Sequence, residues 1–215
     1  MMMDPETQKN RNYLQQAWLV LLLGFLYGGA LAGVHTSLAP RIAENRLQET
    51  LNVIPDLVPG AVIQQTEMLS IAGPGGQMER IYRTADAAGQ HNGWVLVAAG
   101  QGFADRIEIL VGLDPQFTTI TGVYVLDQKE TPGLGDDIRD AEFLDQFRGK
   151  SADIPLSVVK MSPSLPGEVQ ALTGATVSTW AVCDIVNQAI DQWRDPILDQ
   201  QVSSASGTSS ADEIP

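Results

Sequence analysis

The chain has 215 residues, a formal net charge of −13 and a hydrophobic fraction of 44%, which is typical of a globular protein. Its acidic body would repel phosphate, which argues against a nucleic-acid partner. A single cysteine, Cys183, excludes an intrachain disulfide. Cys183 has no second cysteine with which to form a metal-binding motif, and His35 and His91 are far apart in the sequence. No metal site is therefore predicted.

The first expected element is an apolar helix near the N-terminus. No formal charge occurs from Asn12 to Pro40, and the apolar run from Ala17 to Val34 would rise about 27 Å as a helix, close to the ~30 Å core of a bilayer. The apolar region of a signal peptide is shorter, about 7–15 residues, and Pro40 directly follows the small-residue cleavage site that could be drawn. We therefore expect a retained transmembrane helix over residues 17–38 rather than a cleaved signal.

Small residues line this helix at a regular spacing. Gly24 and Gly28 are four positions apart, as are Gly29 and Gly33. This spacing lets two helix backbones approach closely in lipid, so a partner helix in a larger membrane assembly is expected, although glycine is also simply commoner in membrane helices. The basic residues on the two sides of the apolar run balance, so charge bias does not decide its orientation.

A domain of mixed structure is expected after the apolar helix. Residues 41–53 are good helix formers, and this helix either stands alone or continues the first one past Pro40. The prolines and glycine of I-P-D-L-V-P-G predict its end. Strand-like runs bounded by turn signals follow at residues 79–84, 93–98, 106–113 and 120–126. Their short spacing predicts an antiparallel meander rather than βαβ units, and therefore an α+β domain.

Two helices are expected after the strands. A short acidic helix over residues 136–147 would bury Phe143, Leu144 and Phe147. Residues 178–193 carry apolar side chains at helical spacing, with Ser178 or Thr179 as N-cap and Pro196 ending the region. The polar segment 199–215 should be disordered. The expected organisation is a tail over 1–16, a transmembrane helix over 17–38, a domain over 39–198 and a tail over 199–215.

Two loops carry the candidate chemistry. In K-E-T-P-G-L-G, residues 129–135, a proline and two glycines predict a tight loop whose backbone can approach a ligand closely. In L-T-G-A-T-V-S-T, residues 172–179, four hydroxyl residues precede a helix whose free N–H groups suit a phosphate. Alternatively, these hydroxyls merely cap the helix. Neither a Walker lysine nor G-x-G-x-x-G is present, and no acid–base or nucleophile constellation indicates a catalytic residue.

These motifs, in this order behind one apolar helix, resemble the FMN-binding domain of the G subunit of the Rnf electron transport complex. The C subunit of the sodium-translocating NADH:quinone reductase is related. V-G-L-D, I-T-G-V-Y-V-L, E-T-P-G-L-G and T-G-A-T carry the resemblance, which spans essentially the whole chain. The family pattern D-x-x-[ST]-G-A-T implies that Thr176 bears covalent FMN through a phosphoester. Gln170 stands at the Asp position, so attachment here would be slower or would depend on nearby Glu168.

The resemblance implies a membrane-anchored electron-transfer subunit of a ferredoxin:NAD oxidoreductase complex that translocates ions. It places a single-pass protein in the inner (cytoplasmic) membrane, with residues 1–16 cytoplasmic and the domain periplasmic, and it implies other membrane subunits and a flavin transferase as partners. The alternatives are the C subunit of the quinone reductase, whose body is usually longer, and a flavin-free assembly module. The cofactor contacts that it implies are Thr176, Thr173, Gly174, Ala175, Val177, Ser178 and Thr179 in the turn, and Glu130, Thr131, Gly133 and Leu134 in the loop, with Glu130 holding the loop or touching the cofactor.

Overall fold

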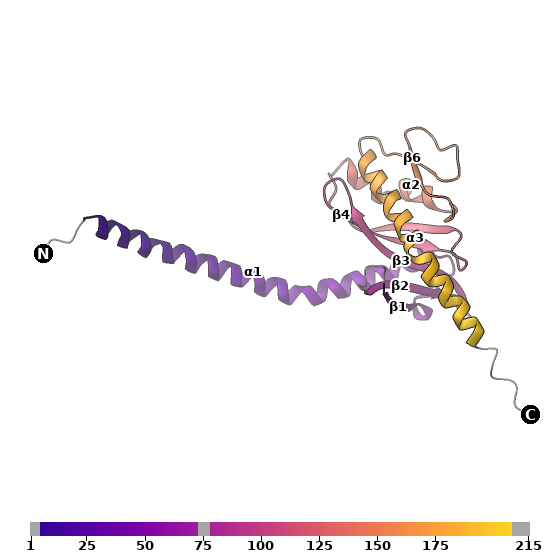
Figure 1. The fold of residues 1–215 in the computed structure, drawn as a ribbon, viewed down its shortest axis with the longest axis horizontal. Helices are drawn as coiled ribbons and strands as arrows, with labels where there is room; N and C mark the ends of the chain where they lie inside the picture. Colours follow the sequence, from indigo (N-terminus) through magenta and orange to yellow (C-terminus); the bar gives the residue numbers. More distant parts are fainter. Residues whose placement is uncertain (1–4, 73–77, 208–215) are drawn as a thin grey trace, which may run out of the picture. The chain divides into compact units, whose positions relative to one another are not determined.

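The computed structural model describes residues 5–72 and 78–207, and it describes side chains over residues 17–71 and 79–198. The chain divides into two units, Met1–Gln48 and Glu49–Pro215. The first unit is helical, and the second contains an antiparallel sheet with flanking helices (Figure 1). The α+β class expected from the sequence is therefore confirmed, as is the single N-terminal apolar helix.

Helix α1 spans Pro5–Leu57 without interruption. The helix expected at residues 41–53 is thus the continuation of the first, and Pro40 does not end it, because one missing hydrogen bond can be tolerated in a long helix of good formers. The helix ends at Leu57, within the I-P-D-L-V-P-G segment as expected, although helical backbone continues past Pro55. The buried side chains of Ile54 and Leu57 hold this last turn in the core of the second unit.

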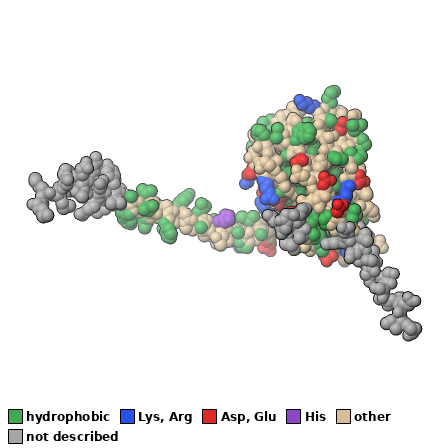
Figure 2. All heavy atoms as spheres, in the orientation of Figure 1, with side chains coloured by type: hydrophobic (Ala, Val, Ile, Leu, Met, Phe, Trp, Pro, Cys, Tyr) green, Lys and Arg blue, Asp and Glu red, His purple; other side chains and the backbone are tan. Residues whose placement is uncertain are grey.

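The part of α1 from Ala17 onward is long and apolar enough to cross a membrane. Its most apolar stretch has a mean hydropathy of 2.0, and none of that stretch is buried against the rest of the protein. Figure 2 shows hydrophobic side chains along this helix. Trp18, Phe25 and Leu26 are among the exposed large apolar residues of the segment. Its length and its exposed apolar surface make this part of α1 a candidate membrane span.

The sheet is an antiparallel meander in the order β1-β2-β3-β4-β5. Its strands are β1 Glu67–Ala72, β2 Met78–Ala85, β3 His91–Gln101, β4 Arg106–Leu113 and β5 Ile120–Asp127. The four strands and the meander expected from the sequence are confirmed. The expectation missed β1, an edge strand whose sequence, E-M-L-S-I-A, contains one β-branched residue and gives a weak strand signal.

Helix α3, Thr176–Gly207, lies against β3 and β4 (Figure 1). Its apolar stripe, with Val182, Val186 and Trp193, is buried against Leu96 and Ile109 of the sheet. Burial of each such side chain contributes about 1.5–3 kcal/mol, so this contact fixes the position of α3 on the sheet.

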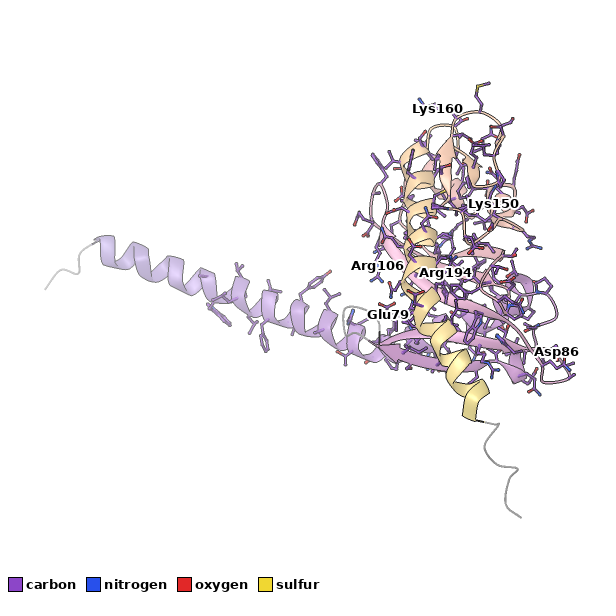
Figure 3. The ribbon with its side chains drawn as sticks, turned by 45° about the vertical axis from the view of Figure 1, so that its right-hand side comes forward. Glu79, Asp86, Arg106, Lys150, Lys160 and Arg194 are labelled. Carbon is purple, nitrogen blue, oxygen red and sulfur yellow. The ribbon has the colours of Figure 1, made fainter. Side chains whose placement is uncertain are left out.

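Polar contacts also hold the C-terminal half of α3, and Figure 3 labels two of the residues that make them, Glu79 and Arg194. Gln192 donates a 2.8 Å hydrogen bond to Glu79 of β2. Arg194 forms a 2.9 Å ion pair with Asp153 and donates a 2.6 Å hydrogen bond to the carbonyl of Ala152. These contacts hold α3 along both the sheet and the loop that precedes β6.

The limits of α3 differ from those expected. The helix begins at Thr176 rather than after a cap at Ser178 or Thr179, and it continues through Pro196. Ile197, directly after this proline, is fully buried, so core packing keeps the chain helical there. Within the tail predicted to be disordered, the backbone is helical to Gly207, and residues 208–215 lie outside the described residues.

The segment expected as one acidic helix forms three short pieces. They are η2 Gly135–Arg139, α2 Ala141–Leu144 and η3 Asp145–Phe147. Asp140 has extended backbone and interrupts the helix, but Phe143 and Phe147 are buried as expected, with ring centroids 5.4 Å apart. A short helix, η1 Ile63–Gln65, and a two-stranded parallel sheet of β6 Ser157–Val159 and β7 Glu168–Gln170 complete the fold.

Candidate functional site

A cavity of about 230 Å³ lies where the 130–135 loop, the β3–β4 turn and the start of α3 meet. The cavity brings together most of the residues expected from the two motifs, although the motifs, residues 129–135 and 172–179, are far apart in the sequence. Its lining consists of Phe103, Glu130, Thr131, Leu134, Gly135, Gly174, Ala175, Thr176, Val177 and Ser178. Of the expected contacts, Thr173, Gly133 and Thr179 do not line it.

The 130–135 loop is closed by one carbonyl oxygen. The Thr131 carbonyl accepts hydrogen bonds from the amides of Leu134 at 3.2 Å and Gly135 at 3.0 Å. Gly133 has a φ of +74°, a conformation that side chains rarely adopt. This compact turn leaves Leu134 46% exposed at the cavity.

Glycine at position 174 allows the second motif to approach this loop. Gly174 has a φ of +84°, and a Cβ atom there would lie 2.7 Å from Cδ2 of Leu134. A Cβ atom at Gly135 would lie 2.8 Å from Cβ of Glu130 and 3.0 Å from Oγ of Ser178. The two glycines therefore leave room at the cavity where other residues would fill it.

The start of α3 offers donors for an anion. The Ala175 amide donates to the carbonyl of Leu172 at 3.1 Å, and the Thr179 amide donates to the carbonyl of Ala175 at 3.0 Å. The amides of Thr176, Val177 and Ser178 come before the first intrahelical donor, the Thr179 amide, so within the described residues they have no backbone acceptor. Because the helix dipole is positive at this end, these amides suit the phosphate of a cofactor.

Neither of the two predicted N-cap residues caps the helix. The Ser178 hydroxyl donates a 2.6 Å hydrogen bond to Oε2 of Glu130. The Thr179 hydroxyl donates to the carbonyl of Ala175 at 3.0 Å and accepts from the Leu172 amide at 3.2 Å. Both side chains are buried and form hydrogen bonds within the site, although Ser178 also lines the cavity.

Thr176 differs from the other hydroxyl residues of the motif. It lines the cavity and is partly exposed, and within the described residues its hydroxyl has no hydrogen-bond partner. Thr173 is exposed but lies outside the lining. Thr176 is therefore the hydroxyl in this motif that combines access to the cavity with a free oxygen.

Glu130 connects the three segments of the site. Its side chain is 4% exposed. Oε1 accepts a 3.1 Å hydrogen bond from the Ala104 amide in the β3–β4 turn, and Oε2 accepts the hydrogen bond from Ser178. This buried carboxylate accepts two hydrogen bonds, and through them it joins the 130–135 loop to the β3–β4 turn and to the start of α3.

Residue 170, at the Asp position of the family pattern, does not bring a carboxylate to the site. Gln170 lies on β7, where its backbone N–H donates a 2.7 Å hydrogen bond to Oε1 of the Gln146 side chain. Glu168 is engaged elsewhere: its Oε2 accepts from the amides of Ser164 at 2.7 Å and Leu165 at 3.1 Å. These hydrogen bonds lower the pKa of Glu168 and hold its carboxylate on its own turn.

Two lining residues were not among the expected contacts. Gly135 lies at the end of the loop motif, so the motif itself marked it. Phe103 directly follows the G-Q-G turn signal between two strands, and no contact was expected at this position. An aromatic residue within a glycine-rich hairpin turn is the signal that could have identified it. Within the described residues no cluster of His, Cys, Asp and Glu suits a metal ion.

Residues 102–191 match the FMN-binding domain family. The G subunit of the ion-translocating oxidoreductase complex of Methanosarcina acetivorans is 30% identical over 149 residues, which cover 69% of this chain and 75% of that protein. The protein of the same name from Aliivibrio fischeri (strain ES114) is 30% identical over 192 residues, covering 82% and 89%. The crystal structure of Shewanella oneidensis NqrC shares the fold, with a TM-score of 0.53, 21% identity, and coverage of 66% of this chain and 72% of that one.

Proposed function

Because this chain belongs to the family of G subunits of ion-translocating oxidoreductase complexes, we propose that it is an electron-transfer subunit that carries FMN at Thr176. The family is the one that the sequence motifs resembled. The observation that carries the proposal is the state of Thr176: within the part of the chain that the structure describes, its hydroxyl has no hydrogen-bond partner, and it lines a cavity beside helix amides that have no backbone acceptor.

The residues of the cavity fit a flavin phosphate and its ring system. The amides of Thr176, Val177 and Ser178 would hold the phosphate, and Gly174 leaves space for it. Leu134 and Val177, which are 46% and 54% exposed, would give the ring system an apolar surface. Bound FMN supplies the exchange of one or two electrons, while the protein supplies its position and surroundings.

Covalent attachment would make this cofactor permanent. The Thr176 oxygen would lose its proton and attack the phosphorus of an FMN donor, while the bond from phosphorus to the donor's leaving group breaks and that group takes up a proton. Relative to free FMN, the product has the composition of protein plus FMN minus water. No carboxylate at position 170 assists this step, and Glu168 is held by Ser164 and Leu165. We therefore propose that a flavin transferase supplies the base that the reaction needs.

We further propose that residues 17–38 anchor the protein in the inner membrane. The exposed apolar surface of this part of α1 supports the anchor, and the relatives are named as subunits of ion-translocating complexes. Residues 1–16 would be cytoplasmic and the domain over 39–198 periplasmic. A Cβ atom at Gly24, Gly28, Gly29 or Gly33 would meet nothing within 4 Å, so either pair of glycines would allow another membrane subunit to approach the helix closely.

Two other functions are less well supported. Likeness to NqrC at 21% identity concerns the fold alone, whereas the relatives cited above are named as G subunits, which favours the Rnf complex over the quinone reductase. Gln170 at the Asp position favours a flavin-free assembly module. A free threonine hydroxyl and open helix amides in one cavity have no use in such a module, so the flavin-carrying function is preferred.

The proposal is tested on full-length protein purified in detergent after co-expression with a flavin transferase. We expect a yellow protein, a fluorescent band that survives denaturing electrophoresis, and an intact mass equal to the polypeptide plus FMN minus water. A colourless protein with the mass of the bare polypeptide would contradict the proposal and favour the assembly module.

A further inference from the structure

We propose that Phe103, in the turn between β3 and β4, is an aromatic wall of the cofactor site that contacts the flavin ring system and lowers its midpoint potential. This inference rests on the proposed function, because it assigns a further residue to the same cavity. It follows from the exposure of Phe103, from the way in which its turn is fixed, and from the side chains opposite to it.

Phe103 is a large apolar side chain without apolar cover. It is 66% exposed, although it lines the same cavity as Thr176. Leu134 and Val177, from two other segments, are also exposed there. Three apolar side chains that meet at one cavity form a surface on which a flat aromatic ligand would remove apolar area from water. The isoalloxazine ring system is such a ligand.

The turn that carries Phe103 is fixed on both sides of this residue. The Gly102 amide donates to the carbonyl of Asp105 at 2.8 Å, which closes the hairpin. The Ala104 amide donates to Oε1 of Glu130 at 3.1 Å. Asp105 also forms a 3.2 Å ion pair with Lys129, the residue before Glu130. Phe103 thus has a defined place despite its exposure.

Gly102 shows how closely this turn approaches the loop. A Cβ atom at this position would clash with Oε1 of Glu130 and would lie 2.7 Å from the carbonyl oxygen of Asp105. The other oxygen of the same carboxylate binds Ser178, two residues after Thr176. One buried carboxylate therefore sets the position of Phe103 relative to the predicted attachment point.

The chemistry of the contact predicts its effect on the cofactor. Aromatic rings prefer to pack against one another in stacked or edge-to-face arrangements. A phenyl ring beside the flavin also excludes water from one side of it. Because reduction adds electrons to the flavin, a less polar surrounding disfavours the reduced form and lowers the midpoint potential.

The experiment uses flavin-loaded full-length protein and compares wild type with Phe103→Ser, Phe103→Tyr and Met161→Ser. Tyrosine keeps the ring, and Met161 is 80% exposed and does not line the cavity. The midpoint potential is measured by spectroelectrochemical titration, and access of solvent to the flavin by iodide quenching of its fluorescence. Intact mass confirms that each variant carries the flavin, and circular dichroism confirms that it is folded.

We expect Phe103→Ser to shift the midpoint potential to more positive values and to raise the iodide quenching constant. Phe103→Tyr should retain the wild-type potential more closely than Phe103→Ser does, and Met161→Ser should match wild type. If loaded Phe103→Ser has the potential and the quenching constant of wild type, the aromatic wall is refuted while the proposed function stands. If wild type itself carries no flavin, the proposed function fails first, and the inference fails with it.

Discussion

Glu130 and Ser178, 48 positions apart in the sequence, are joined by a buried hydrogen bond of 2.6 Å from the serine hydroxyl to the glutamate carboxylate. The same carboxylate accepts the Ala104 amide. This arrangement links the loop after β5, the turn after β3 and the first turn of α3. It explains why the cavity has a defined shape although its walls come from three separate segments.

Replacement of Glu130 should destabilise the fold and disturb the site. Glu130→Ala removes a buried acceptor and leaves Ser178 unpaired, so we expect the free energy of unfolding to fall by about 2–4 kcal/mol. Glu130→Gln keeps one acceptor and should lose less. Urea unfolding of the domain measures both changes, and Glu142→Ala, at an exposed position in α2, is the control. Equal stability of Glu130→Ala and the control would contradict the connecting role.

Thr176→Val should abolish covalent flavin without affecting the fold. Valine has the shape of threonine, and the Thr176 hydroxyl has no partner within the described residues, so the change in the free energy of unfolding should stay within about 0.5 kcal/mol. Thr173→Val is the matched control, because Thr173 is exposed outside the cavity and should leave the flavin attached. Intact mass spectrometry separates the outcomes, and a flavin adduct on Thr176→Val would exclude this residue as the attachment point.

Gly174→Ala should impair the site through a clash. The substitution forces a side chain into a φ of +84° and places Cβ 2.7 Å from Leu134. We expect a loss of about 1–2 kcal/mol of stability and less flavin incorporated. Gly149→Ala is a matched control, since Gly149 has a φ of +77° but a Cβ atom there meets nothing within 4 Å. If both variants incorporate flavin equally well, contact with Leu134 does not shape the site.

The thiol of Cys183 should be inert in the folded protein. Burial raises its pKa to about 12, so the reactive thiolate is scarce at neutral pH. We expect no reaction with Ellman's reagent at pH 8 in native protein and complete reaction after unfolding in guanidinium chloride. Rapid labelling of native protein at pH 8 would show that this part of α3 opens.

Asp114 should make the domain sensitive to acid. Burial raises the pKa of its carboxyl, but hydrogen bonds from Thr118 and Thr119 outweigh this effect and lower the pKa below its usual value. Since the folded pKa is lowered, the stabilisation is present above the unfolded pKa of about 3.9 and is lost as pH falls through the folded value. Asp114→Asn should therefore be less stable than wild type at pH 7 by about 1–2 kcal/mol, and the difference should shrink below pH 4.

Urea unfolding of both proteins at several pH values measures this difference. Asp191→Asn, at an exposed position on α3, serves as the control, with an expected change close to zero in the same titration. A difference between Asp114→Asn and wild type that does not depend on pH would contradict the assignment to the carboxylate charge.

Local patterns along the chain were enough to identify much of the fold. The strands β2 to β5 lie within three residues of their expected limits, because alternating apolar residues and glycine turns are local signals. Helix ends were less predictable. Pro40 and Pro196 both lie inside helices, since a favourable helix or a buried neighbour such as Ile197 outweighs the hydrogen bond that proline removes.

By itself the sequence determined the apolar helix, the antiparallel meander, the family and the two motifs, because each depends on residues close together in the chain. Only the tertiary structure decided which hydroxyls are free. Ser178 is bound by Glu130 and Thr179 by its own turn, whereas Thr176 faces the cavity. It also brought Phe103 beside the motifs. Such contacts depend on how α3 packs on the sheet, which no local pattern encodes.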